Sequence, residues 1–88
     1  MPFNNLNPIS IMTFSALCAE RKKQFEKFGA EPLANRCQLV TIITEEVGEI
    51  AREVNQAGKE EKLRQEVLQV AAICIAYLDG DLHFGNQK

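Results

Sequence analysis

The stretch TEEVGEIARE, residues 44–53, carries four carboxylates in the middle of a segment with helical patterning. The apolar residues around it recur at intervals of three, four and seven, which predicts one buried stripe along a helix. These residues are Leu39, Ile43, Ile50 and Val54, with Ile42 at the edge. Glu46 falls inside that stripe and Glu49 on its flank. The pattern therefore predicts acidic side chains where a helix normally faces a core.

Outward from this stretch, the whole chain has helical patterning, and the expected fold is all-α. A first helix is predicted over about residues 12–28, because apolar side chains recur there at helical spacing. They are Phe14, Leu17, Cys18, Phe25 and Phe28. Gly29 follows directly and is expected to end this helix.

Two further helices are expected. The second runs from residue 35 or 36 to about 57, with Asn35 as its N-cap and Gly58 as the glycine that ends it. The third runs from residue 59 or 60 to 78 and ends near Gly80. The short turn between them predicts an antiparallel helix hairpin as the centre of a compact bundle.

Length and composition limit what the chain can be. Its 88 residues predict a single domain over 1–88, with an irregular lead-in at 1–11 and a tail at 80–88. The formal net charge of -2 gives no reason to expect a nucleic-acid or membrane partner. No targeting segment is recognisable, so a cytoplasmic protein is expected. Cys18, Cys37 and Cys74 form no CxxC pair and are expected as reduced core or boundary residues.

The hairpin also predicts which polar residues face each other. Residues at equal distance from the turn lie side by side, which sets Glu49 level with Glu66 and Glu46 level with Gln69. Glu45 lies at the edge of this group. The sequence thus predicts three carboxylates and one amide between two helices.

Such a group has to be neutralised, because burying an unpaired carboxylate costs several kcal/mol. Cations of the chain itself are one solution, with Arg36, Arg52, Lys62 and Arg64 as candidates. A divalent cation is the other, and a set of carboxylate oxygens suits Mg²⁺ or Mn²⁺. Mg²⁺ commonly takes substrate phosphates as further ligands, which favours a phosphate-handling hydrolase.

EEVGE (45–49), followed by Glu66 in the next helix, resembles the EExxE…ExxD signature of the MazG-like, all-α nucleotide pyrophosphohydrolases. ERKKQFEKFG (20–29) also resembles the first helix of some members, and the similarity covers roughly residues 14–79. It implies that Glu46, Glu49 and Glu66 hold Mg²⁺. It further implies that Glu45 orients or deprotonates the water that attacks the α-phosphorus of a nucleoside triphosphate, releasing a monophosphate and pyrophosphate.

The sequence departs from this signature at Gln69, where the family has Asp. An amide oxygen can bind Mg²⁺ but brings no charge, so weaker metal affinity is expected. The resemblance also implies substrate contacts by Gln24, Lys27, Phe28 and Asn35. Each has a structural alternative: Phe28 as a core anchor, Asn35 as a helix cap, and the other two as solvated side chains.

The third helix indicates assembly. Apolar residues surround its axis from residue 67 to 78, and a helix that is apolar all round is buried on all sides. Three helices of one small subunit cannot achieve that, so a homo-oligomer is expected, in line with the dimers and tetramers of the family. Two alternatives to a nucleoside triphosphate pyrophosphohydrolase stay open: a non-catalytic helical binding module, and a hydrolase of another phosphorylated nucleotide.

Overall fold

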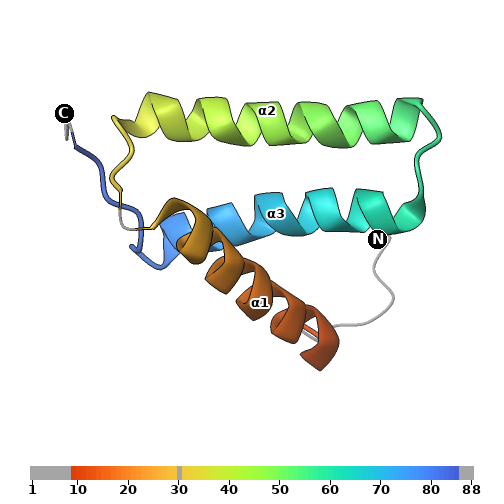
Figure 1. Cartoon of the computed structure of the whole chain (residues 1–88), viewed down its shortest axis with the longest axis horizontal. Coiled ribbons are helices and arrows are strands. Elements are labelled where there is room, and N and C mark those ends of the chain that lie inside the picture. Colours follow the sequence, from red (N-terminus) through yellow and green to blue (C-terminus); the bar gives the residue numbers. More distant parts are fainter. Residues whose placement is uncertain (1–8, 30, 86–88) are drawn as a thin grey trace.

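The computed structural model describes residues 9–29 and 31–85, and it consists of three α-helices (Figure 1). Helix α1 spans Ile11–Phe28, α2 spans Arg36–Asn55 and α3 spans Glu60–Leu78. The described part of the chain has no β-strand; Leu33 and Phe84 form one isolated bridge. The predicted all-α class is therefore confirmed.

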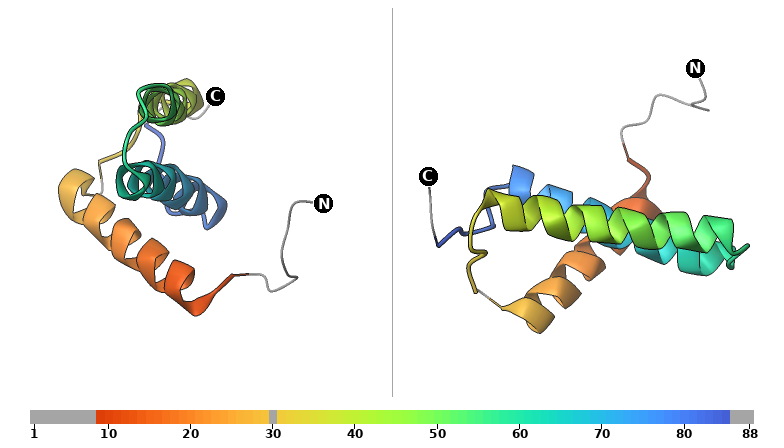
Figure 2. Two further views of the ribbon diagram at one scale, coloured as in Figure 1. Left: turned by 90° about the vertical axis from the view of Figure 1, so that its right-hand side faces the viewer. Right: turned by 90° about the horizontal axis from the view of Figure 1, so that it is seen from above.

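Helix α3 is central to the arrangement. It packs against both α2 and α1, whereas α1 and α2 do not contact each other. Helices α2 and α3 lie side by side with the chain reversing between them, and α1 crosses α3 obliquely on its other side (Figures 1 and 2). Among the described residues, each outer helix consequently has one face that no other helix covers.

Local signals place the helix ends close to where the sequence predicts them. The Oδ1 atom of Asn35 accepts a hydrogen bond from the backbone N–H of Gln38 at 3.0 Å, so Asn35 is the N-cap of α2 as expected. Gly29 ends α1 with φ 67°, and its N–H donates to the carbonyl of Phe25. Gly80 follows α3 with φ 76°. Both glycines adopt the left-handed region that other residues avoid.

The turn between α2 and α3 corrects one expectation. Ala57 has the positive φ, at 53°, and Gly58 does not. Gly58 is needed for a different reason: its N–H donates to the carbonyl oxygen of Glu53 at 2.8 Å. A Cβ atom at this position would lie 3.1 Å from that same oxygen and closer still to the Glu53 carboxylate. The glycine therefore allows a close backbone approach and does not supply the left-handed residue.

The buried core is small. Only Leu17, Leu39 and Ala72 are buried apolar residues in the described part of the chain, together with the polar Glu20 and Glu66. The sequence predicts that Val54 belongs to the buried stripe of α2, but its side chain is 59% exposed. Glu53, with a side chain 23% exposed, lies on the covered face in its place.

The apolar side chains of α1 mostly face away from α3. Phe14, Phe25 and Phe28 are each at least 60% exposed, so the core-anchor alternative for Phe28 is wrong for this chain. Cys18 shares their exposed face, and Cys37 lies on the outer face of α2. The expectation of core or boundary cysteines is therefore wrong for these two, while Cys74 is half-buried. Helix α1 contacts α3 through a different face, which is mainly polar.

The segment after α3 does not extend freely where the structure describes it. The N–H of Leu33 donates to the carbonyl of His83 at 2.8 Å, and the N–H of Gly85 donates to the carbonyl of Leu33 at 2.7 Å. The Arg36 guanidinium lies 5.4 Å from the centre of the Phe84 ring. These contacts tie the segment after α3 to the connection between α1 and α2. Residues 1–8 of the expected lead-in and 86–88 of the expected tail lie outside the described residues.

None of the three helices combines the length and the apolar character that crossing a membrane requires, within residues 9–29 and 31–85.

Candidate functional site

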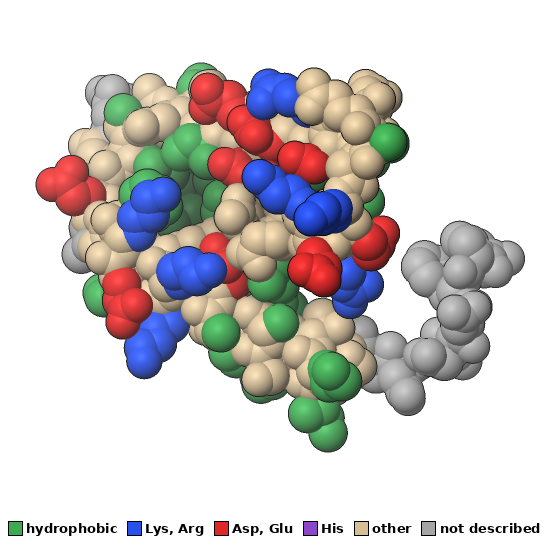
Figure 3. All heavy atoms as spheres, turned by 45° about the vertical axis from the view of Figure 1, so that its right-hand side comes forward, with side chains coloured by type: hydrophobic (Ala, Val, Ile, Leu, Met, Phe, Trp, Pro, Cys, Tyr) green, Lys and Arg blue, Asp and Glu red, His purple; other side chains and the backbone are tan. Residues whose placement is uncertain are grey.

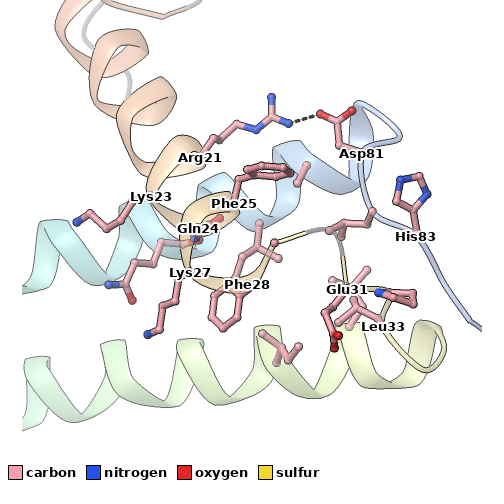
Figure 4. Close-up of a pocket in the computed structure, with 18 of the residues that line it drawn as sticks. Arg21, Lys23, Gln24, Phe25, Lys27, Phe28, Glu31, Leu33, Asp81 and His83 are labelled. Carbon is pink, nitrogen blue, oxygen red and sulfur yellow. Dashed lines mark hydrogen bonds and ion pairs between the residues drawn. The ribbon is translucent and has the colours of Figure 1, made fainter.

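A cavity of about 1050 Å³ opens where α1, the connection before α2 and the segment after α3 meet the α2–α3 pair. Figure 3 shows the hollow from one side, with hydrophobic side chains inside it and charged side chains of both signs around it. Figure 4 shows residues from all of these elements converging on it. Its volume is at the upper end of the range of small-molecule sites, and a nucleotide would fit.

The cavity is polar at one end and mixed in character at the other. Going along α2 from its start, Leu39 and Ile42 come first and Glu46 a turn later; along α3, Gln69 precedes Ile73. Toward the α2–α3 turn the lining is polar. It consists there of Glu20, Lys23, Gln24, Lys27, Glu46 and Gln69. The opposite end combines apolar side chains (Phe28, Leu33 and Leu82) with polar and charged ones (Arg21, Glu31, Gln38, Asp81 and His83).

Glu46 lines the cavity, and Glu66 lies near it but outside the lining. Glu66 is only 8% exposed, and its carboxylate has no hydrogen bond or ion pair among the described residues. In the described residues, every side-chain oxygen or nitrogen atom that is shielded from solvent has a hydrogen-bond partner. The Glu66 carboxylate has no such partner, so it keeps an accessible edge. Burial raises the pKa of Glu46 above its usual value, and the charges of Glu66, Glu49 and Glu45 raise it further. Lys27 acts in the opposite direction.

Glu49 belongs to this group only in part. One of its oxygens lies 3.5 Å from the Arg52 guanidinium, and its side chain is 47% exposed. Arg52 is one of the cations that the sequence offered as a neutralising partner, and the structure brings it to one member of the group. Within residues 9–29 and 31–85, no three His, Cys, Asp or Glu side chains lie close enough to hold one metal ion.

A second carboxylate site lies on α1. Glu20 is 4% exposed, and its Oε1 accepts a hydrogen bond from the Gln65 amide at 3.0 Å. Its Oε2 accepts a longer bond from Gln24 Nε2 at 3.4 Å, and Lys23 Nζ lies 3.5 Å from Oε1. Gln24 Nε2 also donates to the backbone carbonyl of Gln69 at 3.1 Å. This network joins α1 to α3 at the polar end of the cavity.

The residues expected to bind substrate divide into two groups. Gln24, Lys27 and Phe28 all line the cavity, and Figure 4 shows them projecting from the last turns of α1. Asn35 does not line it, and its side chain caps α2. Glu45 is exposed and lies outside the lining as well, although its charge still reaches Glu46.

Sequence reasoning missed several residues of the cavity. Glu20 had a local signal, because it lies three residues after Leu17 on the same face of α1. Leu33, Leu82 and His83 had none. They meet only because the segment after α3 pairs with the connection before α2, a contact between parts of the chain about fifty residues apart.

Comparisons of the chain with protein-family models, with curated proteins and with solved structures give no match.

Proposed function

We propose that this chain is a Mg²⁺-dependent nucleoside triphosphate pyrophosphohydrolase. The observation that supports it most is the carboxylate of Glu66, which is buried, unpaired among the described residues and next to Glu46. The carboxylate keeps an accessible edge and no protein cation in the described part pairs with it, so it can accept a cation. Glu66 does not itself line the cavity, but its neighbour Glu46 does.

The pairing of α2 with α3 supports the same proposal. We infer an antiparallel hairpin in the register that sets Glu49 level with Glu66. Lys62 Nζ lies 3.9 Å from a carboxylate oxygen of Glu53, and these two residues are placed symmetrically about the same turn. The register that brings this ion pair together is the one expected for the acidic residues.

The donor atoms are of the type that a hard divalent cation prefers, and side chains would have to move to bring three carboxylates onto one ion in the described part of the chain. Glu46, Glu66 and the amide of Gln69 offer oxygen atoms only, which is the ligand type that Mg²⁺ and Mn²⁺ prefer. Glu49 would become a further ligand if its carboxylate left the ion pair with Arg52 and bound the cation. When bound, Mg²⁺ neutralises phosphate oxygens and lowers the pKa of water. The raised pKa of Glu46 is consistent with a site built for added positive charge.

The two ends of the cavity match the two ends of a nucleotide. The mixed end, where Phe28 and Leu33 offer apolar surface and Gln38 and His83 offer hydrogen-bonding groups, suits a base and sugar, and the polar end suits the phosphates. A water molecule would attack the α-phosphorus, and the bond from that phosphorus to the bridging oxygen would break. Pyrophosphate leaves, the monophosphate remains, and one proton is released. The family resemblance implies that Glu45, which is exposed and lies outside the cavity lining, accepts the proton.

Pyrophosphate release tests the proposal directly. The parent protein should release pyrophosphate from at least one of a panel of ribo- and deoxyribonucleoside triphosphates in Mg²⁺, and not in chelator. Glu66→Gln should reduce that rate by at least about a hundredfold, because it removes a charge from the site. Glu61→Gln is the matched control, since Glu61 is exposed on the same helix, and it should leave the rate unchanged. An inactive parent, or an active Glu66→Gln variant, would exclude the proposal.

A non-catalytic binding module remains the second candidate. It is favoured by the ion pair that already neutralises Glu49, and by the absence of a three-carboxylate group close enough for a metal in the described residues. Such a module would bind nucleotides or other phosphorylated compounds and release no pyrophosphate. A hydrolase of another phosphorylated nucleotide would hydrolyse that compound and leave the ordinary nucleoside triphosphates intact. The same panel, extended to phosphoribosyl nucleotides, separates the three.

We also propose that the chain assembles as a homo-oligomer. Ala72 is fully buried, and the residues around it on α3 are only partly covered by α1 and α2. Large apolar side chains of α1 are exposed as well, including Ile11, Met12 and Phe14. A thin core with this much exposed apolar surface is typical of chains that complete their packing through a second copy.

A further inference from the structure

Two lysines of α1 stand at the polar end of the cavity, opposite the acidic residues of α2. Lys23 and Lys27 are four residues apart, so they lie on one face of the helix. Both line the cavity together with Glu46. Figure 4 shows both side chains extending from α1 on the same side as Gln24, with Lys27 reaching toward α2.

The two lysines have different partners within the chain. Lys23 Nζ lies 3.5 Å from the buried Glu20 carboxylate, so part of its charge is already balanced. Lys27 forms no ion pair among the described residues, and its Nζ lies 5.3 Å from the centre of the Phe28 ring. It therefore offers a positive charge and three hydrogen-bond donors to whatever occupies the cavity.

The wall that carries these lysines is firmly anchored. Glu20 is held by Gln65, and Gln24 by the backbone of Gln69, so this part of α1 is joined to α3 by hydrogen bonds on both sides of Lys23. A lysine on a fixed helix is better placed to recognise an anion than one on a free surface, because less of the backbone has to become ordered on binding.

We propose that Lys27, assisted by Lys23, binds the diphosphate half of the substrate, which becomes the pyrophosphate product. A diphosphate presents several anionic oxygens, so it can accept hydrogen bonds from both ammonium groups. Its other oxygens would face the carboxylate side, where Glu46 and Glu66 alone would repel it. The site thus has anion-binding groups on α1 and cation-binding groups on α2 and α3, and it selects a metal-complexed polyphosphate.

This inference rests on the proposed function and narrows it. It predicts that ligands with at least two linked phosphates bind, and that monophosphates bind far more weakly. It also assigns the two lysines to phosphate recognition, whereas the family resemblance implies only a general substrate contact for Lys27.

Calorimetric titration with magnesium pyrophosphate tests the inference without any catalytic step. Three variants of full-length protein with the same charge change are compared with the parent: Lys27→Gln, Lys23→Gln and Lys22→Gln. Lys22 is exposed on the same helix and does not line the cavity, so it is the matched control. Thermal melts of each variant establish that it is folded.

The expected order of effects follows from the ion pairs. Lys27→Gln should weaken pyrophosphate binding by about tenfold or more, the loss typical of a hydrogen bond to a charged group. Lys23→Gln should weaken it less, because Glu20 already shares that charge. Lys22→Gln should change it by less than about twofold. Equal weakening by Lys22→Gln and Lys27→Gln, an unaffected Lys27→Gln, or a parent that binds no pyrophosphate would each overturn the inference.

Failure of the inference is distinguishable from failure of the proposed function. If the parent hydrolyses triphosphates and Lys27→Gln binds pyrophosphate normally, the lysine assignment is wrong and the hydrolase proposal stands. If pyrophosphate binding depends on Lys27 but no triphosphate is hydrolysed, the anion site stands and the hydrolase proposal is wrong.

Discussion

Glu46 on α2 and Glu66 on α3 bring acidic side chains onto helix faces that are expected to be apolar. Burial raises the pKa of Glu46, and the charge of Glu66 raises it further. A cation bound beside Glu46 would lower that pKa again, so the protein with metal should differ from the protein without it.

The raised pKa of Glu46 predicts a specific pH dependence of stability. The folded state holds the Glu46 proton more tightly than the unfolded state, so stability falls as pH rises from the usual value of 4.5 through the raised pKa. Below the usual value both states are protonated, and this contribution vanishes. In chelator, Glu46→Gln should therefore gain in melting temperature relative to the parent as pH rises through that window. A constant difference between the two proteins across the window would contradict the expectation.

We expect the side chain at position 69 to affect the stability of the protein differently with and without Mg²⁺. Gln69 lines the cavity with Glu46 and lies one turn from Glu66 on α3. Gln69→Asp should bind Mg²⁺ more tightly than the parent, because it adds a charged ligand. In chelator the same variant should be less stable, because one more carboxylate joins the group. Thermal melts with and without Mg²⁺ decide; equal losses in both conditions would rule out a metal-site role for position 69.

In the α2–α3 turn, we expect a change from alanine to glycine to stabilise the protein and a change from glycine to alanine to destabilise it. Ala57 adopts a positive φ that costs an L-residue roughly 1–2 kcal/mol, and glycine avoids that cost. Ala57→Gly should therefore stabilise the protein by about 0.5–1 kcal/mol, after the greater freedom of glycine in the unfolded chain is subtracted. Gly58→Ala should destabilise it, because a Cβ would meet the Glu53 carbonyl. Urea unfolding measures both, and the reverse order would show that the turn differs from this description.

The contact between α1 and α3 depends on a buried carboxylate. Glu20→Ala leaves the Gln65 amide without its partner and weakens the bonding of Gln24, which should cost about 1–3 kcal/mol in unfolding free energy. Glu26→Ala is the control on the same helix, because Glu26 is exposed, and it should stay within about 0.5 kcal/mol of the parent. Similar losses in the two variants would mean that the Glu20 network adds no stability.

At the scale of the whole molecule, the exposed apolar face of α1 is the main unexplained surface. Ile11, Phe14, Cys18 and Phe25 lie on one face of the helix by their spacing, and all four are exposed. A contiguous apolar face of this kind is typical of an interaction surface. A second copy bound to this face would lie close to the cavity, because Phe25 belongs both to the face and to the cavity lining.

Sedimentation tests the assembly that this surface predicts. At micromolar concentration the protein should have at least twice the 9.9 kDa mass of one chain. Phe14→Ser should shift it toward the monomer by removing apolar area from the α1 face, whereas Val54→Ser, equally exposed but on α2, should not. A parent that sediments as a monomer would remove the assembly proposal and leave the exposed face without an occupant.

The three helices, the N-cap of α2 and the acidic residues along α2 could all be predicted from the amino-acid sequence. These features depend on residues within a few positions of each other, such as Asn35 and Gln38 or Phe25 and Gly29, so local patterning is sufficient to predict them. The face of α1 that meets α3 could not be predicted in this way, because it depends on contacts between helices. Both an apolar and a polar face were available on that helix, and hydrogen bonds from Gln65 and to the Gln69 backbone, on another helix, made the polar one the contact. The cavity has the same origin, because Leu33 and His83 meet through backbone hydrogen bonds between distant segments that leave no periodic signal in the sequence.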